Sequence, residues 1–229
     1  NKSIDDDILE RKTKILSQSN NIENVEINEF DEIEKFTVII YKDFRLKRLK
    51  EFFDIEKITK DDQNILHAIH ILSNEKLLIF LSSGRVFSLD PNVLPGGKSN
   101  PKSFIQFIDA GTNEIIVGIL NGNTTDKCIM ITKLAKGFIA FSKNMITNHK
   151  KGKQVFNLKT NDYLVKVLNY DKKYLACVTK LAKMLIFDTD SLPTMNKGLG
   201  VQIIKIKDKD SLSDVKLINL NDGLEWISG

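Results

Sequence analysis

A short pattern of residues recurs along this chain at intervals of nearly 50 residues, and internal repetition restricts the fold more than composition does. The pair Leu94-Pro95 returns as Leu192-Pro193, 98 residues later (192 − 94 = 98), which is two intervals of 49. The segment 133–136, Lys-Leu-Ala-Lys, returns at 180–183 after 47 residues (180 − 133 = 47). A weaker first copy begins in the stretch 38–50. We therefore expect four copies of roughly 40 to 50 residues.

Within each copy the hydrophobic residues form short runs rich in β-branched and aromatic side chains, which favour strands over helices. These runs lie at 38–41, 77–81, 115–120, 129–131, 138–141, 174–178, 184–187, 201–206 and 215–220. Turn-forming residues such as Ser82-Ser83-Gly84 and Asn121-Gly122-Asn123 separate them. Many short strands joined by frequent turns predict an all-β fold. The only helix that we expect is near Asp5 to Leu16, where Ile4, Ile8 and Ile15 could share a face.

Each copy reads as a strand, a tight basic turn, a second strand and a loop rich in proline, glycine and lysine. A unit of this size cannot bury both faces of its sheet, so neighbouring copies must pack face to face. This predicts a propeller-like fold of about five four-stranded blades, open or closed. The boundaries that we expect are a leader at 1–36, repeats near 37–76, 77–122, 128–172 and 174–210, and a partial repeat at 211–229, with the leader and the partial repeat building or closing a fifth blade. A sandwich of irregular strands with accidental similarity is the alternative.

Charge is unevenly distributed between the leader and the rest of the chain. The whole chain carries 34 basic and 30 acidic residues, and residues 1–36 hold five of the bases and ten of the acids, or 5 − 10 = −5. The remainder is therefore (34 − 5) − (30 − 10) = +9. A body with this excess can meet a polyanion. The alternative is an ordinary lysine-rich surface, which charge alone does not exclude.

The chain shows few features typical of an enzyme or a membrane protein. No apolar run approaches the roughly 20 residues of a membrane-spanning helix, so we expect a soluble protein without a membrane partner. Cys128 and Cys177 sit inside apolar stretches and suit buried thiols. His67 and His70 would fall on opposite faces of a strand, and no Cys or third His is near enough in sequence to complete a metal site. We therefore read them as core or edge histidines. No catalytic residue is identifiable.

Several linked motifs in one order carry a resemblance to a known family. They are Leu77-Leu78-Ile79-Phe80, Ser83-Gly84-Arg85-Val86-Phe87, Leu94-Pro95-Gly96-Gly97-Lys98, Lys151-Gly152-Lys153-Gln154-Val155, Asn157-Leu158-Lys159, Leu185-Ile186-Phe187, Leu192-Pro193, Lys197-Gly198-Leu199-Gly200-Val201 and Leu212-Ser213-Asp214. Together they resemble the C-terminal domain shared by the A subunits of gyrase and topoisomerase IV, the topoisomerase IV version more closely. Glu10 to Ile15 also resembles the segment that, in this family, leaves the coiled-coil region and enters the domain.

This resemblance implies a β-pinwheel, a relative of the propeller that binds and bends duplex DNA without sequence specificity for a type IIA topoisomerase. It implies that the chain is a fragment without catalytic activity or cofactor of its own. The parent enzyme would be an ATP-dependent type II topoisomerase that needs ATP and Mg²⁺ elsewhere. It would pair with itself and with the ATPase-bearing B subunit through other domains, and would act in the bacterial cytoplasm on the nucleoid. Asn1 in place of a starting Met agrees with a fragment.

The sequence departs from the family at two places. Where gyrase carries a Gln-Arg-Arg-Gly-Gly-Lys-Gly box, residues 148–154 read Asn-His-Lys-Lys-Gly-Lys-Gln. The loss of this box favours a topoisomerase IV role in decatenation and relaxation over supercoiling by wrapping. The sequence also stops at Gly229, where the family would add at least another strand, so the last blade would be incomplete.

Basic residues recur at matching positions of the copies, beside glycines that let the backbone approach phosphates. We expect the DNA-binding residues to be Arg45, Lys47, Arg48, Arg85, Lys98, Lys102, Lys136, Lys150, Lys151, Lys153, Lys183 and Lys197. A row of such loops, one on each blade, would bend the duplex. The alternative function is a propeller scaffold that binds a protein partner through the acidic leader or an exposed strand edge.

Overall fold

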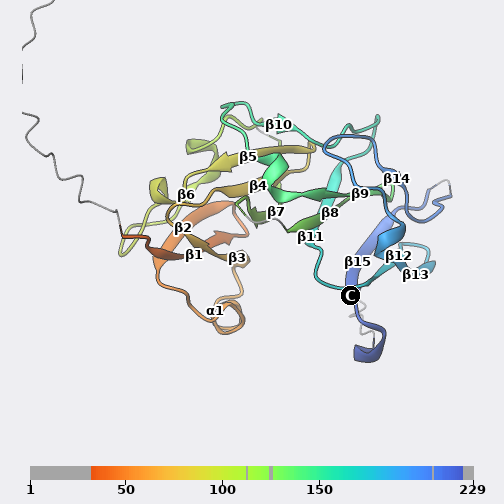
Figure 1. The fold of residues 1–229 in the computed structure, drawn as a ribbon, viewed down its shortest axis with the longest axis horizontal. Coiled ribbons are helices and arrows are strands. Elements are labelled where there is room, and N and C mark those ends of the chain that lie inside the picture. Colours follow the sequence, from red (N-terminus) through yellow and green to blue (C-terminus); the bar gives the residue numbers. More distant parts are fainter. Residues whose placement is uncertain (1–31, 112, 124–125, 208, 224–229) are drawn as a thin grey trace, which may run out of the picture. The chain divides into compact units, whose positions relative to one another are not determined.

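The structure is a computed structural model that describes residues 32–223 apart from positions 112, 124, 125 and 208. The helix expected near Asp5 to Leu16, and most of the expected leader, lie outside the described residues. The described residues form short strands and very little helix (Figure 1). The strands are β1 (Lys35–Tyr41), β2 (Arg45–Lys50), β3 (Ile65–Leu72), β4 (Leu77–Leu81), β5 (Arg85–Leu89), β6 (Lys102–Ser103), β7 (Ile116–Asn121), β8 (Lys127–Thr132), β9 (Lys136–Phe141), β10 (Lys153–Gln154), β11 (Leu164–Asn169), β12 (Tyr174–Thr179), β13 (Met184–Asp188), β14 (Val201–Gln202) and β15 (Leu212–Ile218).

Among the described residues there is one α-helix, α1 (Ile55–Asp61), which the sequence analysis did not predict. It begins after Asp54, whose side chain accepts a hydrogen bond from the backbone N–H of Lys57 and so caps the helix. Short 3₁₀ turns connect other strands, at η1 (Pro91–Val93), η2 (Phe104–Gln106), η3 (Ser142–Met145), η4 (Thr189–Ser191) and η5 (Leu220–Asp222). The prediction of an all-β fold is confirmed.

The strands form four antiparallel sheets within the described residues. Their strand orders are β3-β1-β2-β6, β10-β5-β4-β7, β11-β8-β9-β14 and β13-β12-β15. We number these sheets 1 to 4 in that order. Each contains one hairpin of consecutive strands, β1-β2, β4-β5, β8-β9 and β12-β13, and these hairpins correspond to the four copies in the sequence. The accidental-sandwich alternative is therefore excluded.

The expected count of about five blades exceeds the four sheets that the described residues build. β15, from the stretch expected to begin a partial fifth repeat, is instead an edge strand of sheet 4, paired with β12. β1 begins at Lys35, so the last two residues of the expected leader belong to sheet 1. The run 201–206, expected to be one strand, contributes only the two residues of β14.

The outermost strand of each of the first three sheets comes from the following repeat. β6 follows the hairpin of sheet 2 but pairs with β2 of sheet 1. In the same way β10 pairs with β5 of sheet 2, and β14 pairs with β9 of sheet 3. We call β6, β10 and β14 the outer strands; each lies beside its partner in Figure 1. This backward exchange links every repeat to the one before it.

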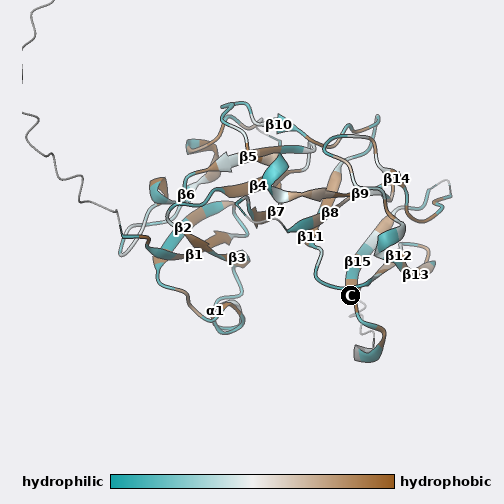
Figure 2. Ribbon diagram, in the orientation of Figure 1, coloured by the Kyte–Doolittle hydropathy of each residue, from teal (hydrophilic) through white to brown (hydrophobic). Residues whose placement is uncertain are grey.

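Hydrophobic packing between consecutive sheets forms the core. One cluster joins sheets 1 and 2 and includes Phe36 and Leu77, both with no exposed surface. A second joins sheets 2 and 3, where Phe138 stacks on Phe156 with ring centroids 4.9 Å apart. A third joins sheets 3 and 4. The apolar residues of β4 and β9 are brown in Figure 2. Each fully buried large side chain stabilises the fold by roughly 1.5 to 3 kcal/mol.

The central hairpins share one turn geometry. A residue just before the second strand has a positive φ in all four. Phe44 (59°), Gly84 (75°) and Ala135 (54°) directly precede β2, β5 and β9, and Ala182 (58°) lies two residues before Met184, where β13 begins. In each turn the N–H of this residue donates to the residue three positions earlier, as from Ala135 to Thr132 (2.9 Å). This is the three-residue loop that ends in a left-handed residue. The two cysteines are buried as predicted, and burial raises the pKa of each thiol to about 12.

Candidate nucleic-acid interface

The loop before each outer strand carries glycine and lysine. These three segments, which we call the outer loops, are residues 95–99, 148–152 and 196–200, and they lead into β6, β10 and β14. Each is bonded to the sheet that precedes its own repeat. Pro95 O accepts from Arg48 N (2.9 Å) of β2, and Lys151 O accepts from Arg85 Nη1 (3.0 Å) of β5. Just before the third loop, Pro193 O accepts from Ile139 N (2.9 Å) of β9. The structure therefore places the three outer loops at equivalent positions of sheets 1, 2 and 3.

Four predicted bases of the outer loops are exposed, namely Lys98, Lys150, Lys151 and Lys197. Within the described part of the chain their side chains have no hydrogen bond or ion pair. Lys102 of β6 is also exposed and follows the first loop. Because these ammonium groups are exposed and have no partner among the described residues, they can contact phosphate oxygens without first breaking an ion pair there.

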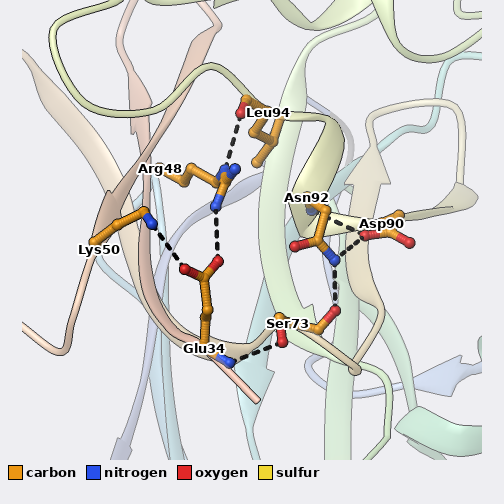
Figure 3. A network of polar contacts seen from close by, with 7 residues as sticks. All are labelled: Glu34, Arg48, Lys50, Ser73, Asp90, Asn92 and Leu94. Atoms are coloured by element: carbon orange, nitrogen blue, oxygen red, sulfur yellow. Dashed lines mark hydrogen bonds and ion pairs between the residues drawn. The ribbon is translucent and has the colours of Figure 1, made fainter. Parts of the chain in front are cut away.

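Two of the predicted arginines are instead occupied by internal partners. Figure 3 shows Arg48 between Leu94 and Glu34. Its Nε donates to Leu94 O (3.1 Å), Nη1 lies 3.8 Å from a Glu34 carboxylate oxygen, and the guanidinium lies 4.2 Å from the Phe36 ring centroid. The Arg48 side chain keeps only 19% of its surface exposed. Arg48 therefore fastens the first outer loop to sheet 1.

Arg85 plays the same part at the second outer loop. Its Nη1 donates to Lys151 O (3.0 Å), and its Nε and Nη2 both donate to the Glu114 carboxylate. The Arg85 and Glu114 side chains are 25% and 12% exposed. Burial alone would raise the pKa of Glu114, but the hydrogen bonds from Arg85, Ser83 and the Gly111 N–H outweigh it and hold that pKa below its ordinary value of 4.5.

The remaining predicted bases either have an internal hydrogen-bond or ion-pair partner or are half-buried at a hairpin. Lys153 Nζ donates to Asn144 O (2.7 Å), and Lys183 Nζ donates to Lys205 O (3.0 Å). Arg45 is exposed but paired with Asp43 (2.6 Å). Lys47 and Lys136 are half-buried at the hairpins of sheets 1 and 3. The structure thus brings the outer-loop lysines to equivalent places and assigns other predicted bases to fastening loops and turns.

Sequence reasoning missed the glutamines of the outer strands. Gln154 Nε2 donates to Ser83 O (2.8 Å), and Gln202 Nε2 donates to Leu134 O (2.8 Å), in each case the turn of the sheet that receives the strand. The signal for them is a glycine, one residue, a glutamine and two apolar residues, present at 152–156 and again at 200–204. These side chains hold the outer strands, and with them the outer loops, in place.

No group of three or more His, Cys, Asp or Glu side chains that could hold a metal is found in the described residues. None of the helices that the structure describes is long and apolar enough to cross a membrane. A hollow of about 660 Å³ lies among β7, β11 and β15 and is lined by residues that include Lys166, Leu168 and Lys216, not by the outer loops.

The ion pair between Arg85 and Glu114 leads to a prediction about folding stability. Replacement of Glu114 with Gln should lower the free energy of unfolding by roughly 1 to 3 kcal/mol, because Arg85 loses its charged partner in a mostly buried position. The pKa of Glu114 is lower in the folded protein than its ordinary value. The ionised Glu114 therefore contributes fully to folding stability above the ordinary carboxyl pKa, and this contribution is lost as the pH falls through the folded-state pKa.

Urea unfolding between about pH 3 and pH 7 measures this effect. The difference between the parent protein and Glu114→Gln should shrink at the acidic end. Equal stability of the two proteins at neutral pH would show that the Arg85–Glu114 pair does not support the fold. Asp43→Asn, which removes the exposed partner of Arg45, is the matched control and should change stability by less than about 1 kcal/mol.

Comparison with known proteins agrees with this architecture. Residues 173–219 match the family described as DNA gyrase C-terminal domain, beta-propeller. The chain is 30% identical over 207 residues to the A subunit of DNA topoisomerase 4 from Rickettsia bellii. The aligned region covers 90% of this chain and 28% of that relative. It is 24% identical to the protein of the same name from Escherichia coli, over 58% of the chain and 18% of the relative. The chain thus spans less than a third of the length of these relatives.

Solved structures share the fold. The E. coli ParC C-terminal domain superposes with a TM-score of 0.72 at 20% identity, covering 81% of this chain and 80% of that one. A crystal structure of the C-terminal domain of DNA topoisomerase IV gives 0.69 at 19% identity, covering 82% and 62%. Four hairpin-centred sheets, the match to the gyrase model and the topoisomerase 4 relatives all agree with the resemblance seen in the sequence. The chain belongs to the family of β-pinwheel C-terminal domains found in the A subunits of gyrase and topoisomerase IV.

Proposed function

We propose that this domain binds and bends duplex DNA without sequence specificity, through the outer loops, and that it does so for a topoisomerase IV that decatenates and relaxes DNA. The observation that carries the proposal is the repeated placement of uncompensated lysines, Lys98, Lys150, Lys151 and Lys197, at equivalent positions of three consecutive sheets. The relatives named as the A subunit of DNA topoisomerase 4 support it.

The chemistry of these loops suits phosphate better than bases. Lysine ammonium groups neutralise phosphates and release condensed counterions, which gives affinity that is independent of sequence and sensitive to salt. Gly152 has a positive φ of 69° and follows directly after Lys150 and Lys151, so the backbone of the loop turns sharply next to its charges. Contacts on successive sheets would hold separate phosphates, and bending would let one duplex reach several of them.

The residues with internal partners take a different role in this proposal. Arg48, Arg85 and Lys153 hold the loops, and the free lysines meet the DNA. The parent enzyme would supply DNA cleavage, ATP and Mg²⁺ through other parts. Those parts would also pair it with a second copy of itself and with the ATPase-bearing partner protein.

Salt titration tests the proposal. With about four phosphate contacts, log K for a duplex should fall with log salt at a slope near −3.6. Fluorescence anisotropy with labelled duplexes of two unrelated sequences should give the same slope and similar affinities. Absence of binding at low salt, or affinity that does not change with salt, would contradict a phosphate-contacting interface.

A further inference from the structure

The outer edge of sheet 4 differs from the edges of the other three sheets. Within the described residues no outer strand lies beside β13. Its apolar side chains are accordingly open to solvent, with Met184 54%, Leu185 38% and Ile186 37% exposed, and Leu181 in the preceding turn 67% exposed. In sheet 3 the equivalent Phe138 and Ile139 are 0% and 2% exposed. Among the residues that the structure describes, β13 is therefore an unpaired hydrophobic strand edge, a feature that invites strand addition.

Sheets 2 and 3 show what such an edge binds. In sheet 3, Gln202 lies opposite Lys136, its Nε2 donates to Leu134 O, and the N–H of the following Ile203 donates to Ala135 O (2.8 Å).

Sheet 2 repeats the arrangement. Gln154 lies opposite Arg85, its Nε2 donates to Ser83 O, and the N–H of Val155 donates to Gly84 O (3.0 Å). One glutamine side chain and one backbone N–H thus occupy the two carbonyls of the turn in both sheets.

Sheet 4 offers the same two carbonyls, and no residue in the described part of the chain supplies these donors. Leu181 and Ala182 are the equivalents of Leu134 and Ala135, and Ala182 has nearly the same φ, 58° against 54°. The turn is held as it is in sheet 3, because Asp210 Oδ1 accepts from Leu181 N (3.2 Å) as Asp162 Oδ1 accepts from Leu134 N (3.0 Å). The carbonyls of Leu181 and Ala182 are therefore preorganised for a strand that is not among the described residues.

We propose that β13 binds an extended segment of another polypeptide in which a glutamine is followed by two apolar residues. The segment runs antiparallel to β13, as β14 runs to β9, with its glutamine opposite Lys183 and the preceding residue opposite Met184. The glutamine side chain donates to Leu181 O, and the next N–H donates to Ala182 O. The two apolar residues after the glutamine then lie opposite Ala182 and Leu181, as Ile203 and Ile204 continue past Gln202 in sheet 3. The first of them reaches the exposed Met184 side chain, because the Ile203 side chain lies beside Gly137, the equivalent of Met184. This is peptide recognition by strand addition.

A second copy of this chain is a poorer occupant. It has three segments in which a glutamine is followed by two apolar residues. Those at 154–156 and 202–204 begin in strands that already pair with β5 and β9 of their own chain. In the third, Gln106 ends the η2 turn, and Phe107 and Ile108 pack in the core between sheets 1 and 2. To donate any of the three, a copy would have to open one of its own sheets or its core. A separate polypeptide with a free segment carries no such cost.

Binding of a labelled peptide with the sequence of residues 198–206 to the full chain tests the proposal. Fluorescence anisotropy should show saturable binding, and a peptide with Gln202→Ala should bind at least roughly fivefold more weakly, the loss expected for one net hydrogen bond. Amide NMR shifts caused by the peptide should cluster at residues 181–186.

Two variants of the protein locate the site. Ile139 N–H points away from β8, toward Pro193 O, so the equivalent Ile186 N–H and the N–H of Met184, two residues earlier, point to the open edge. Met184→Pro should abolish binding because it removes an edge donor, and proline is tolerated on an edge strand. Met184→Ala keeps the N–H and should bind nearly as well as the parent. If Met184→Pro does not fold, the peptide pair and the shift map still decide.

Three results would overturn the proposal. They are absence of saturable binding up to about 1 mM peptide, shifts that fall away from β13, and equal affinity of the two peptides. Sedimentation in the absence of peptide addresses the second copy as occupant. A dimer whose formation shifts the β13 amides would show that this edge binds another copy and not a foreign segment. None of these outcomes depends on DNA binding.

Discussion

Replacement of Lys98, Lys151 and Lys197 with glutamine, one lysine from each outer loop, should weaken duplex binding several-hundredfold at about 0.1 M salt. Each lost phosphate contact removes about 0.9 from the slope of log K against log salt, so the slope should become shallower by about 2.7. The fold should be unaffected, because these side chains are exposed and have no partners in the described part of the chain. Anisotropy titrations at several salt concentrations measure both quantities.

A charge-matched control separates local contact from general attraction. Lys57 and Lys60 on α1, and Lys216 on β15, are also exposed. Their joint replacement with glutamine changes the net charge equally but leaves the outer loops intact, and should alter affinity by less than about tenfold. If both triple variants lose the same affinity, the interface is not the outer loops and binding follows net charge.

Gly84→Ala should destabilise the domain by roughly 2 to 4 kcal/mol. Gly84 ends the hairpin turn of sheet 2 with a φ of 75°, where a side chain is strained. An added Cβ would lie 2.5 Å from Phe156 O and 2.9 Å from Phe156 Cβ, in the segment that follows β10. Because both Val155 N and Phe156 N donate to Gly84 O, the alanine would push β10 off sheet 2 and disturb the core that contains Phe156.

Urea unfolding monitored by circular dichroism measures this change as a lower midpoint with a similar slope. Gly97→Ala is the control, since Gly97 also has a positive φ, 58°, but a Cβ there would meet no atom within 4 Å. It should cost only the conformational strain, about 1 kcal/mol. Equal losses in the two variants would show that backbone strain, and not the contact with Phe156, accounts for the effect.

The repeats and the hairpins could be predicted from the sequence because their signals are local. Ser82-Ser83-Gly84 provides the left-handed residue that this turn requires, and the recurring Lys-Leu-Ala-Lys marks the same turn in sheets 3 and 4 although Ala135 and Ala182 stand there in place of glycine. Short apolar runs rich in β-branched residues then identified the central strands. Helix α1 was missed because it buries none of its residues and so has no apolar face to recognise.

The strand exchange could not be predicted from the same signals. Each outer strand has two residues, too short for any periodicity, and its partner belongs to a different repeat. The roles of the bases were hidden for a related reason. Arg85 and Lys98 both sit at recurring basic positions, but only the fold brings Glu114 next to Arg85 and leaves Lys98 exposed. Charge in a sequence does not distinguish a side chain that fastens a loop from one that meets solvent.

The backward exchange of strands also governs how the chain can acquire its structure during synthesis. Sheet 1 is complete only when Ser103 has been made, sheet 2 only after Gln154, and sheet 3 only after Gln202. A nascent chain that has emerged as far as Ser103 therefore still exposes the β5 edge of sheet 2, which closes only when Gln154 follows, after the hairpin of β8 and β9 has been made. Each outer strand thus completes the preceding sheet, so the newest hairpin presents an open strand edge until the outer strand of the following repeat emerges.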